Sequence, residues 1–464
     1  MLMFWIHLAI VLTCIFIGAR LGGLGLGLLG GLGLAVLVFV FKLPMGTLPI
    51  DVIFIILAVI TAASCLQAAG GLDYLVLLAE KALRKNPKMI TFVAPMVTWL
   101  FTFGAGTGHV AYSVMPVIAE VSREAGVRPE RPMSVATIAS QQAITCSPVS
   151  AATASMLIIF TSGVYADSGI SLAAILAICA PATFLGCMVA AFVMNFIGKD
   201  LKDDEIYRER VAKGEIPPIP TTSVERNIKP GARLSVLLFL IGAFGVVVMG
   251  LISGAKKGTF EFLMPLKKFL FERMVDGELT AINMPQTIEI TMLVIAALIV
   301  ILCKVKVDEI VTGNVFKAGI IAVIAIFGIA WMGNTFFEAH RGVIQGGLSA
   351  VVASSPSLAA LLLALALFVL SILLYSQGAT VNALMPLAAS LGPLNPFFCL
   401  AIFPSVNGYF FIPNYPTVVA AINFDRTGTT KIGKYVLNHS FMLPGLIATA
   451  SAITIGFGIA SVFF

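Results

Sequence analysis

Long apolar runs alternate with short polar segments along almost the whole chain. Most runs approach or exceed the roughly 20 residues with which an α-helix crosses a bilayer. They occupy residues 4–19, 23–41, 50–69, 89–120, 133–160 and 171–197, and then 233–253, 287–303, 315–333, 357–391, 397–424 and 435–463. The pattern predicts an all-α polytopic membrane protein.

One long polar segment divides the chain into two halves. It covers residues 199–232, begins KDLKDDEIYRERVAKGEIPP, and combines many charges with several prolines. Such a composition is typical of a linker rather than of a packed domain. We therefore predict a first repeat at 1–198, a cytoplasmic linker at 199–232 and a second repeat at 233–464.

Two apolar runs do not fit a single crossing. The run 89–120 is too long for one comfortable helix and too short for two, and a glycine-rich turn at 104–108 interrupts it. Basic residues on both sides place both of its ends in the cytoplasm. We predict an inner re-entrant helical hairpin there. The run 357–391 repeats the pattern around 376–380 without basic flanks, which predicts an outer hairpin.

Each hairpin is followed by a short loop and by a span that prolines interrupt. The interruptions read TCSPVS at 145–150 and IPNYPT at 412–417. Five crossings are counted in each half, and an odd number forces the second half to be inverted. The sequence thus predicts two inverted repeats of five transmembrane helices, each with one re-entrant hairpin and an interfacial helix. In the first half this helix is the amphipathic segment 73–84, and both termini are expected in the periplasm.

Composition narrows the class of protein further. The chain has 464 residues, of which 59% are hydrophobic and only 11% are charged. Its net charge of +6 does not indicate nucleic-acid binding, because the Lys and Arg residues gather in a few short loops. The seven cysteines lie in or beside apolar runs without CxxC spacing, so no metal and no redox cofactor is predicted.

A glycine-rich segment near the N-terminus, GGLGLGLLGGLG at 22–33, superficially resembles a phosphate-binding loop. It lacks the Lys-Ser/Thr ending of such loops and lies inside an apolar run. We interpret it as a surface for close packing between helices.

The interruptions in the two halves mark the predicted functional site. Irregular backbone at membrane depth is tolerated only where protein buries it or where it lines a cavity. Interruptions at matching positions of inverted halves therefore indicate a transport site. The half-helix N-termini direct backbone N–H groups into that site, which favours an anion. No Asp, Glu, Lys or Arg occurs at 89–119, 132–166 or 342–424, so an intramembrane carboxylate for a cation or proton is not indicated.

Neutral hydroxyls, amides and backbone N–H groups are the ligands that these interruptions provide, and they suit small carboxylates. The predicted substrate-binding residues are Thr107, Gly108, His109, Ser147, Pro148, Ser150, Ser376, Gln377, Gly378, Thr380, Asn382, Asn414, Tyr415 and Thr417. A hydroxyl in a membrane helix often bonds only to a carbonyl of its own helix, and this alternative stays open for each Ser and Thr. For His109, a neutral packed imidazole and a proton carrier are both open.

Several unusual stretches resemble a known transporter family. They are GTGHV at 106–110, RPERPM at 128–133, CSPVS at 146–150, GIAWMGNTFFEAH at 328–340, FFIPNYPT at 410–417 and FDRTGTTKIGKYVLNHSFMLPG at 424–445. On these stretches the chain resembles the anaerobic C4-dicarboxylate transporter (Dcu) family, and more distantly the ion-transporter superfamily with its paired hairpins. The resemblance implies a bacterial inner-membrane carrier that exchanges fumarate, malate or aspartate for succinate during anaerobic respiration.

We therefore predict secondary transport of C4-dicarboxylates, and no enzymatic activity. Taking up a dianion against ~150 mV costs roughly 7 kcal/mol, and exchanging one dianion for another cancels this cost, which favours electroneutral antiport. The two hairpins and broken spans are expected to move in an elevator-like manner against a scaffold, within a homodimer.

Three alternatives stay open. The nearest is a dicarboxylate symporter coupled to Na⁺ or H⁺. An intramembrane hydrolase using Ser147 and His109 is disfavoured, because no GxSxG-type setting surrounds the serine. A membrane receptor that does not transport is the third.

Overall fold

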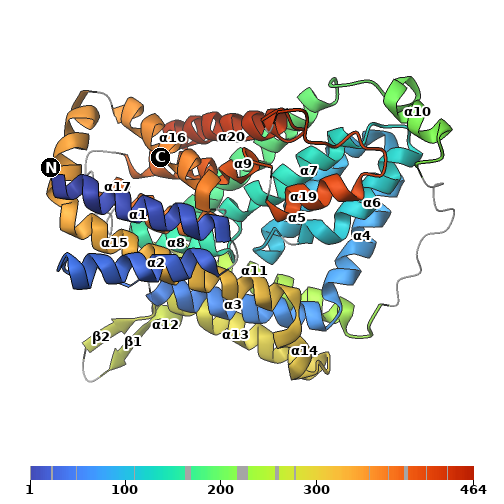
Figure 1. Ribbon diagram of the computed structural model, residues 1–464. Coiled ribbons are helices and arrows are strands. Elements are labelled where there is room, and N and C mark those ends of the chain that lie inside the picture. The colour runs from blue at the N-terminus through green and yellow to red at the C-terminus, as the bar shows by residue number, and fades with distance from the viewer. Residues whose placement is uncertain are drawn as a thin grey trace.

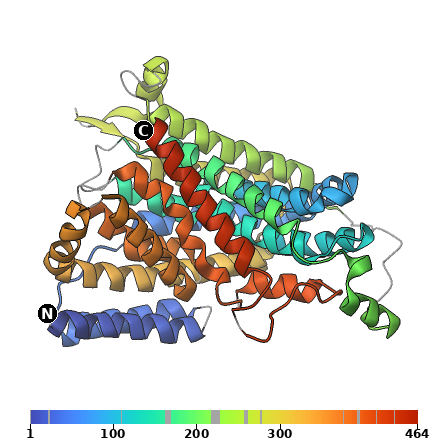
Figure 2. The ribbon, with the colours of Figure 1, turned by 90° about the horizontal axis from the view of Figure 1, so that it is seen from above.

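The computed structural model of the chain is built almost entirely from helices, which form one elongated bundle (Figures 1 and 2). It describes residues 2–21, 24–48, 50–108, 110–161, 169–216, 228–255, 261–275, 278–354, 356–374, 376–390, 395–413, 415–435 and 437–463. The candidate site residues His109 and Asn414 lie outside the described residues.

The elements follow one another in the order α1 (Leu2–Leu21), α2 (Gly25–Ala35), η1 (Val36–Val40), α3 (Ile50–Ala68), α4 (Gly71–Lys85), η2 (Pro87–Met89), α5 (Ile90–Ala105), α6 (Val110–Glu124), α7 (Glu130–Gln142), η3 (Ala143–Cys146), α8 (Ala151–Thr161), α9 (Leu172–Met194), η5 (Leu201–Asp203), α10 (Glu205–Ala212), α11 (Ala232–Ser253), η6 (Glu261–Leu263), α12 (Met264–Phe271), β1 (Glu272–Val275), β2 (Glu278–Ala281), α13 (Met284–Leu302), α14 (Val307–Thr312), α15 (Asn314–Ser354), α16 (Pro356–Leu374), α17 (Gln377–Ser390), α18 (Pro396–Ala401), η7 (Phe403–Phe410), α19 (Pro416–Phe424) and α20 (Met442–Phe463). The η segments are short 3-10 helices, except the π-helical η1. Strands β1 and β2 pair antiparallel in a small hairpin that the sequence did not predict.

Within the described residues, seven helical stretches are long and apolar enough to cross a membrane, and an eighth is counted if a pair of helices bent by 72° forms one span. The seven are Pro87–Ala105, Glu130–Thr161, Leu172–Met194, Ala232–Ser253, Met284–Leu302, Asn314–Val343 and Met442–Phe463. They confirm the predicted class of fold, an all-α polytopic membrane protein. The arrangement as two inverted repeats of five spans stays a prediction.

Helix α7 is buried along almost its whole length. All residues from 131 to 142, in α7, are buried, although this stretch contains several Ser, Thr and Gln residues. Helix α7 packs on α5, α6, α9 and α20, and therefore on elements from both halves of the chain. It leads directly into the first predicted interruption.

Each of the two runs predicted as a re-entrant hairpin forms a pair of consecutive helices, and the re-entrant placement of these pairs stays a prediction. The first consists of α5 and α6, which pack on each other, and the second of α16 and α17. Gly106 ends α5 with φ +71°, and a Cβ at this position would lie 2.6 Å from the carbonyl oxygen of Val149. Only glycine fits both the backbone angle and this close approach. The turn of the first hairpin is thereby fixed against the first broken span.

Two elements differ from the sequence-based prediction. Helix α15 continues for 41 residues to Ser354, whereas the apolar run ended at 333. The end of an apolar run does not end a helix, and Glu338 pairs with Arg341 one turn later at 2.7 Å in the polar continuation. The second broken span is also interrupted over a longer stretch than predicted, because the 3-10 helix η7 separates α18 from α19.

The first part of the polar segment 199–232, predicted as a cytoplasmic linker, is packed against the bundle. Its residues 201–203 and 205–212 form η5 and α10, at the end of the bundle opposite both termini (Figure 1). Arg128 pairs with Asp204, and Arg131 pairs with Asp200 at 2.8 Å. Two carboxylates of this segment are thus paired with Arg128, in the loop before α7, and with Arg131, in the first turn of α7.

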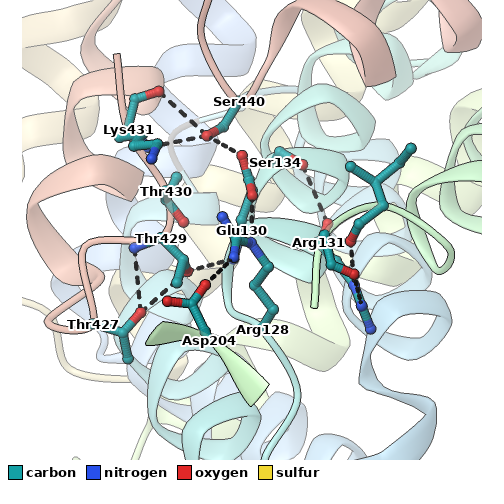
Figure 3. Close-up of polar contacts among 12 residues, drawn as sticks. Arg128, Glu130, Arg131, Ser134, Asp204, Thr427, Thr429, Thr430, Lys431 and Ser440 are labelled. Atoms are coloured by element: carbon teal, nitrogen blue, oxygen red, sulfur yellow. Dashed lines mark hydrogen bonds and ion pairs between the residues drawn. The ribbon is translucent and has the colours of Figure 1, made fainter. Parts of the chain in front are cut away.

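The same loop also contacts the second half of the chain (Figure 3). Glu130 accepts a hydrogen bond from the Ser440 hydroxyl at 2.6 Å, and its backbone N–H donates to the Thr429 hydroxyl at 3.2 Å. Asp425 accepts from the Thr429 hydroxyl at 2.9 Å and from the Thr430 backbone N–H at 2.6 Å. These contacts join the start of α7 to the loop that follows α19.

The glycine-rich segment near the N-terminus packs α2 against α15, as the sequence indicated. A Cβ on Gly27 would lie 2.1 Å from the carbonyl oxygen of Ile324, and one on Gly30 would lie 2.5 Å from the backbone of Gly328. Neither approach leaves room for a side chain. The two backbones are therefore in direct contact.

We predict that Gly30→Ala lowers the thermal stability of the purified protein, because the new Cβ overlaps the backbone of α15. Overpacking of this kind costs about 1–3 kcal/mol. Gly31→Ala is the matched control, since nothing lies within 4 Å of a Cβ there. Thermal unfolding in detergent measures both, and equal midpoints for the two variants would contradict the close approach of α2 and α15.

Candidate functional site

A cavity of ≈ 550 Å³ lies where the hairpin turns and broken spans meet α15. Its lining consists of Gly18, Leu26, Gly106, Thr107, Gly108, Gln141, Ile144, Ala151, Ala152, Ala318, Ile321, Ala322, Ala325, Ile326, Leu374, Ser376, Gln377, Gly378, Tyr415 and Pro416. The volume is within the range of about 300–1,000 Å³ that small-molecule sites occupy.

The turns of both hairpins face this cavity. Thr107 and Gly108 come from the turn between α5 and α6. Ser376 comes from the turn between α16 and α17, and Gln377 and Gly378 are the first two residues of α17. The first broken span contributes residues on both sides of its interruption, and the second contributes the start of α19. Segments about 270 residues apart in sequence thus share one wall.

Four helices begin at the cavity wall. Helices α8, α17 and α19 start at the lining residues Ala151, Gln377 and Pro416, and α6 starts two residues after Gly108. The first backbone N–H groups of a helix have no partner within the helix, and they confer a positive partial charge on its N-terminus. None of the residues that line the cavity bears a formal charge. The helix N-termini therefore contribute positive partial charge to a site that has no fixed cation.

The remaining part of the lining is apolar. It consists of α15 with smaller contributions from α1 and α2, and its side chains are Ala, Ile and Leu. Polar groups are consequently confined to the hairpin turns and the broken spans. Within the described residues, no group of three or more His, Cys, Asp or Glu side chains is placed to hold a metal ion.

The structure separates the predicted site residues into two groups. Thr107, Gly108, Ser376, Gln377, Gly378 and Tyr415 line the cavity. Ser147, Pro148, Ser150, Thr380, Asn382 and Thr417 are buried but are not among the lining residues.

Three residues of the second group hydrogen-bond to backbone carbonyls at or near the hairpin turns. The Ser147 hydroxyl donates to the carbonyl oxygen of Phe103 at 2.7 Å, which ties the first interruption to α5. Thr380 bonds to the carbonyl oxygen of Ser376 at 2.8 Å, and the Asn382 amide bonds to that of Gly378 at 2.8 Å. The Thr380 hydroxyl bonds to a carbonyl of its own helical turn, the alternative that the sequence left open for hydroxyls. These three residues determine the shape of the cavity without facing it.

Sequence reasoning missed Gln141 and the residues of α15. Gln141 and Gln142 are adjacent amides in an apolar run, directly before the first interruption. The distribution of charged residues does not indicate them, because neither side chain is ionisable. The Gln377 Nε2 donates to the Gln141 Oε1 at 3.1 Å, so these side chains join the second hairpin to the first broken span.

The model of the anaerobic C4-dicarboxylate membrane transporter family matches residues 3–464. The C4-dicarboxylate transporters DcuA of Wolinella succinogenes and of Escherichia coli K12 are each 44% identical to this chain, over 98% of it and 99% of their own length. The anaerobic C4-dicarboxylate transporter DcuB of Escherichia coli O6:H1 is 38% identical, over 100% of this chain and 99% of its own.

Two solved transporter structures share the fold at 13% sequence identity. The YdaH transporter of Alcanivorax borkumensis has a TM-score of 0.59 and covers 88% of this chain and 85% of its own. MtrF of Neisseria gonorrhoeae, described as an antimetabolite efflux pump, has a TM-score of 0.53 and covers 92% and 84%. At this identity the likeness concerns the fold alone. The family model and the curated relatives extend along almost the entire sequence, and this chain therefore belongs to the anaerobic C4-dicarboxylate membrane transporter family.

Proposed function

We propose that this chain is a secondary transporter of C4-dicarboxylates in the bacterial inner membrane, working by electroneutral antiport such as fumarate/succinate exchange. Its relatives are named C4-dicarboxylate transporters, and the chain is accordingly not an enzyme. The observation that carries the proposal is the convergence of both hairpin turns and four helix N-termini on one uncharged cavity.

The cavity suits a small dianion. A helix N-terminus stabilises a negative charge by about 0.3–1 kcal/mol at an exposed site and by up to about 2 kcal/mol when partly buried. Hydrogen bonds to a charged group contribute about 1.5–3 kcal/mol each, and Thr107, Gln141 and Ser376 offer such donors. Several helix ends and neutral donors thus take the place of an arginine clamp.

Exchange follows from the charge of this site. Because the lining holds no cation, a loaded cavity carries the full charge of the dianion. Moving two negative charges against ~150 mV costs roughly 7 kcal/mol, and the return of a second dianion cancels that cost.

Symport with a cation is the second candidate, and one observation favours it. The hairpin turns also bring helix C-termini to the cavity, at Gly106 after α5 and at Leu374 in α16. Carbonyl groups at such ends coordinate Na⁺ in other transporters with broken helices.

The division of the cavity walls favours an elevator-like movement. The hairpins and broken spans hold the polar groups and form the moving part, and α15 with α1 and α2 forms the scaffold. We place α10 in the cytoplasm, because basic residues gather at the neighbouring ends of α4, α6 and α7 and in the loop before α7, namely Arg84, Arg123, Arg128 and Arg131. Both termini lie at the other end (Figure 1), which we place in the periplasm, and we expect a homodimer built through the scaffold.

We predict that Thr107→Val lowers succinate counterflow in proteoliposomes by about 10-fold or more, because a charged guest loses a hydroxyl donor. Thr102→Val is the matched control, one turn earlier in α5. Its hydroxyl is buried, has no hydrogen-bond partner among the described residues and does not line the cavity. Equal counterflow by the two variants, at equal membrane abundance, would refute the placement of the site at the hairpin turn.

Antiport and symport predict different rates of uptake into vesicles that contain no dicarboxylate. We expect uptake of labelled succinate into proteoliposomes loaded with unlabelled fumarate to exceed uptake into empty ones by at least about 10-fold. The rate of this exchange should not change when a membrane potential is imposed. Uptake into empty vesicles that requires an inward Na⁺ or H⁺ gradient would replace antiport by the symport candidate.

A further inference from the structure

A relay of buried polar side chains runs from the cavity to α20. Gln377 Nε2 donates to Gln141 Oε1 and to Asn407 Oδ1, both at 3.1 Å. Asn407 Nδ2 donates to Gln142 Oε1 at 3.1 Å, and Gln142 Nε2 donates to the Thr449 hydroxyl at 2.8 Å. All five residues are buried. The relay thereby joins one hairpin, both broken spans and α20.

A single backbone carbonyl sets the direction of this relay. Asn407 Nδ2 also donates to the carbonyl oxygen of Pro404 at 3.1 Å. A flipped Asn407 would direct its Oδ1 at that oxygen and leave two buried acceptors in contact. Asn407 Oδ1 therefore faces Gln377 and accepts a hydrogen bond, which Gln377 donates through its Nε2. Gln141 then accepts that same amino group with its Oε1.

This direction decides which polar atoms face the cavity. Gln141 and Gln377 both line it, and neither Gln141 Nε2 nor Gln377 Oε1 makes a hydrogen bond with any described residue. Gln141 Nε2 lies against the first hairpin turn, because a Cβ on Gly108 would lie 2.2 Å from it. The cavity consequently receives donors from Gln141 and an acceptor from Gln377.

We propose that Gln377 is a specificity-determining residue, whose Oε1 accepts a hydrogen bond from a hydroxyl or ammonium group at C2 of the transported acid. This inference rests on the function proposed above. The carboxylates of the acid accept hydrogen bonds, so they pair with the Gln141 amino group and with helix N-termini. Only a donor satisfies Gln377 Oε1, and malate and aspartate have one at C2, whereas succinate and fumarate do not. Asn407 is the positioning residue that holds this oxygen in place.

The test is substrate discrimination by Gln377→Met, which preserves side-chain length but removes the acceptor. Unlabelled malate, aspartate and succinate compete with labelled fumarate in counterflow, and their half-inhibitory concentrations are compared as ratios. These ratios do not depend on the amount of active protein. Relative to succinate, we expect malate to weaken by about 3- to 10-fold and aspartate, whose donor is charged, by about 10-fold or more.

A second variant tests the relay itself. Asn407→Ala removes the group that fixes the orientation of Gln377. Relative to succinate, malate and aspartate should then inhibit about 3-fold or more weakly, as in Gln377→Met. Asn334→Met is the matched control, because its amide donates to the carbonyl oxygen of Thr47, away from the cavity, and its ratios should equal those of the unmodified protein.

Unchanged malate/succinate and aspartate/succinate ratios in Gln377→Met would overturn the assignment. If that variant does not reach the membrane, unchanged ratios in Asn407→Ala overturn it instead. An unmodified protein that shows no C4-dicarboxylate counterflow would contradict the proposed function, which is a different result from active exchange with unaltered ratios.

Discussion

The need to pair every backbone polar group inside a membrane organises this structure. A helix broken at membrane depth exposes N–H and C=O groups, and each one left unpaired costs several kcal/mol. Polar side chains next to the interruptions meet this need. Ser147 bonds to the carbonyl of Phe103, Ser150 bonds to that of Ile144 at 2.5 Å, and the Ser371 hydroxyl accepts from the N–H of Gly408 at 2.8 Å. The broken segments persist because neighbouring helices pair their backbones.

This pairing leaves few polar groups for a guest. Several buried hydroxyls around the turns bond to backbone carbonyls, and the cavity receives helix N-termini and a small number of polar side chains, among them Gln141 and Gln377. Glycines make the arrangement possible. Gly106 brings the first turn against Val149, and Gly108 leaves space for the Gln141 amide. Support and recognition are thus divided between residues that lie only a few positions apart.

The sequence was informative where structure is determined locally. The length of an apolar run and its Gly or Pro interruptions predict a hairpin or a broken span. The breaks between α5 and α6 and between α16 and α17 include residues 106–108 and residue 376, within the predicted turns 104–108 and 376–380. Which side chain faces the cavity depends on contacts that are distant in sequence. Gln377 bonds to Gln141 across 236 positions, and Asn407 bonds to Gln142 across 265. No local pattern of the sequence indicates such pairs. The packing of the polar segment after 199 likewise depends on Arg128, far outside that segment.

The division of the cavity also explains why exchange suits this site under the proposed function. If the hairpin turns move past the wall formed by α15, the free donors at the helix N-termini must pass Ala and Ile side chains that offer no partner. An empty site would make that movement with unpaired polar groups, each costing several kcal/mol, whereas a bound dicarboxylate pairs them. The loaded form therefore crosses more easily than the empty one. Under the proposed function, obligatory exchange rests on the same pairing requirement that holds the broken helices together.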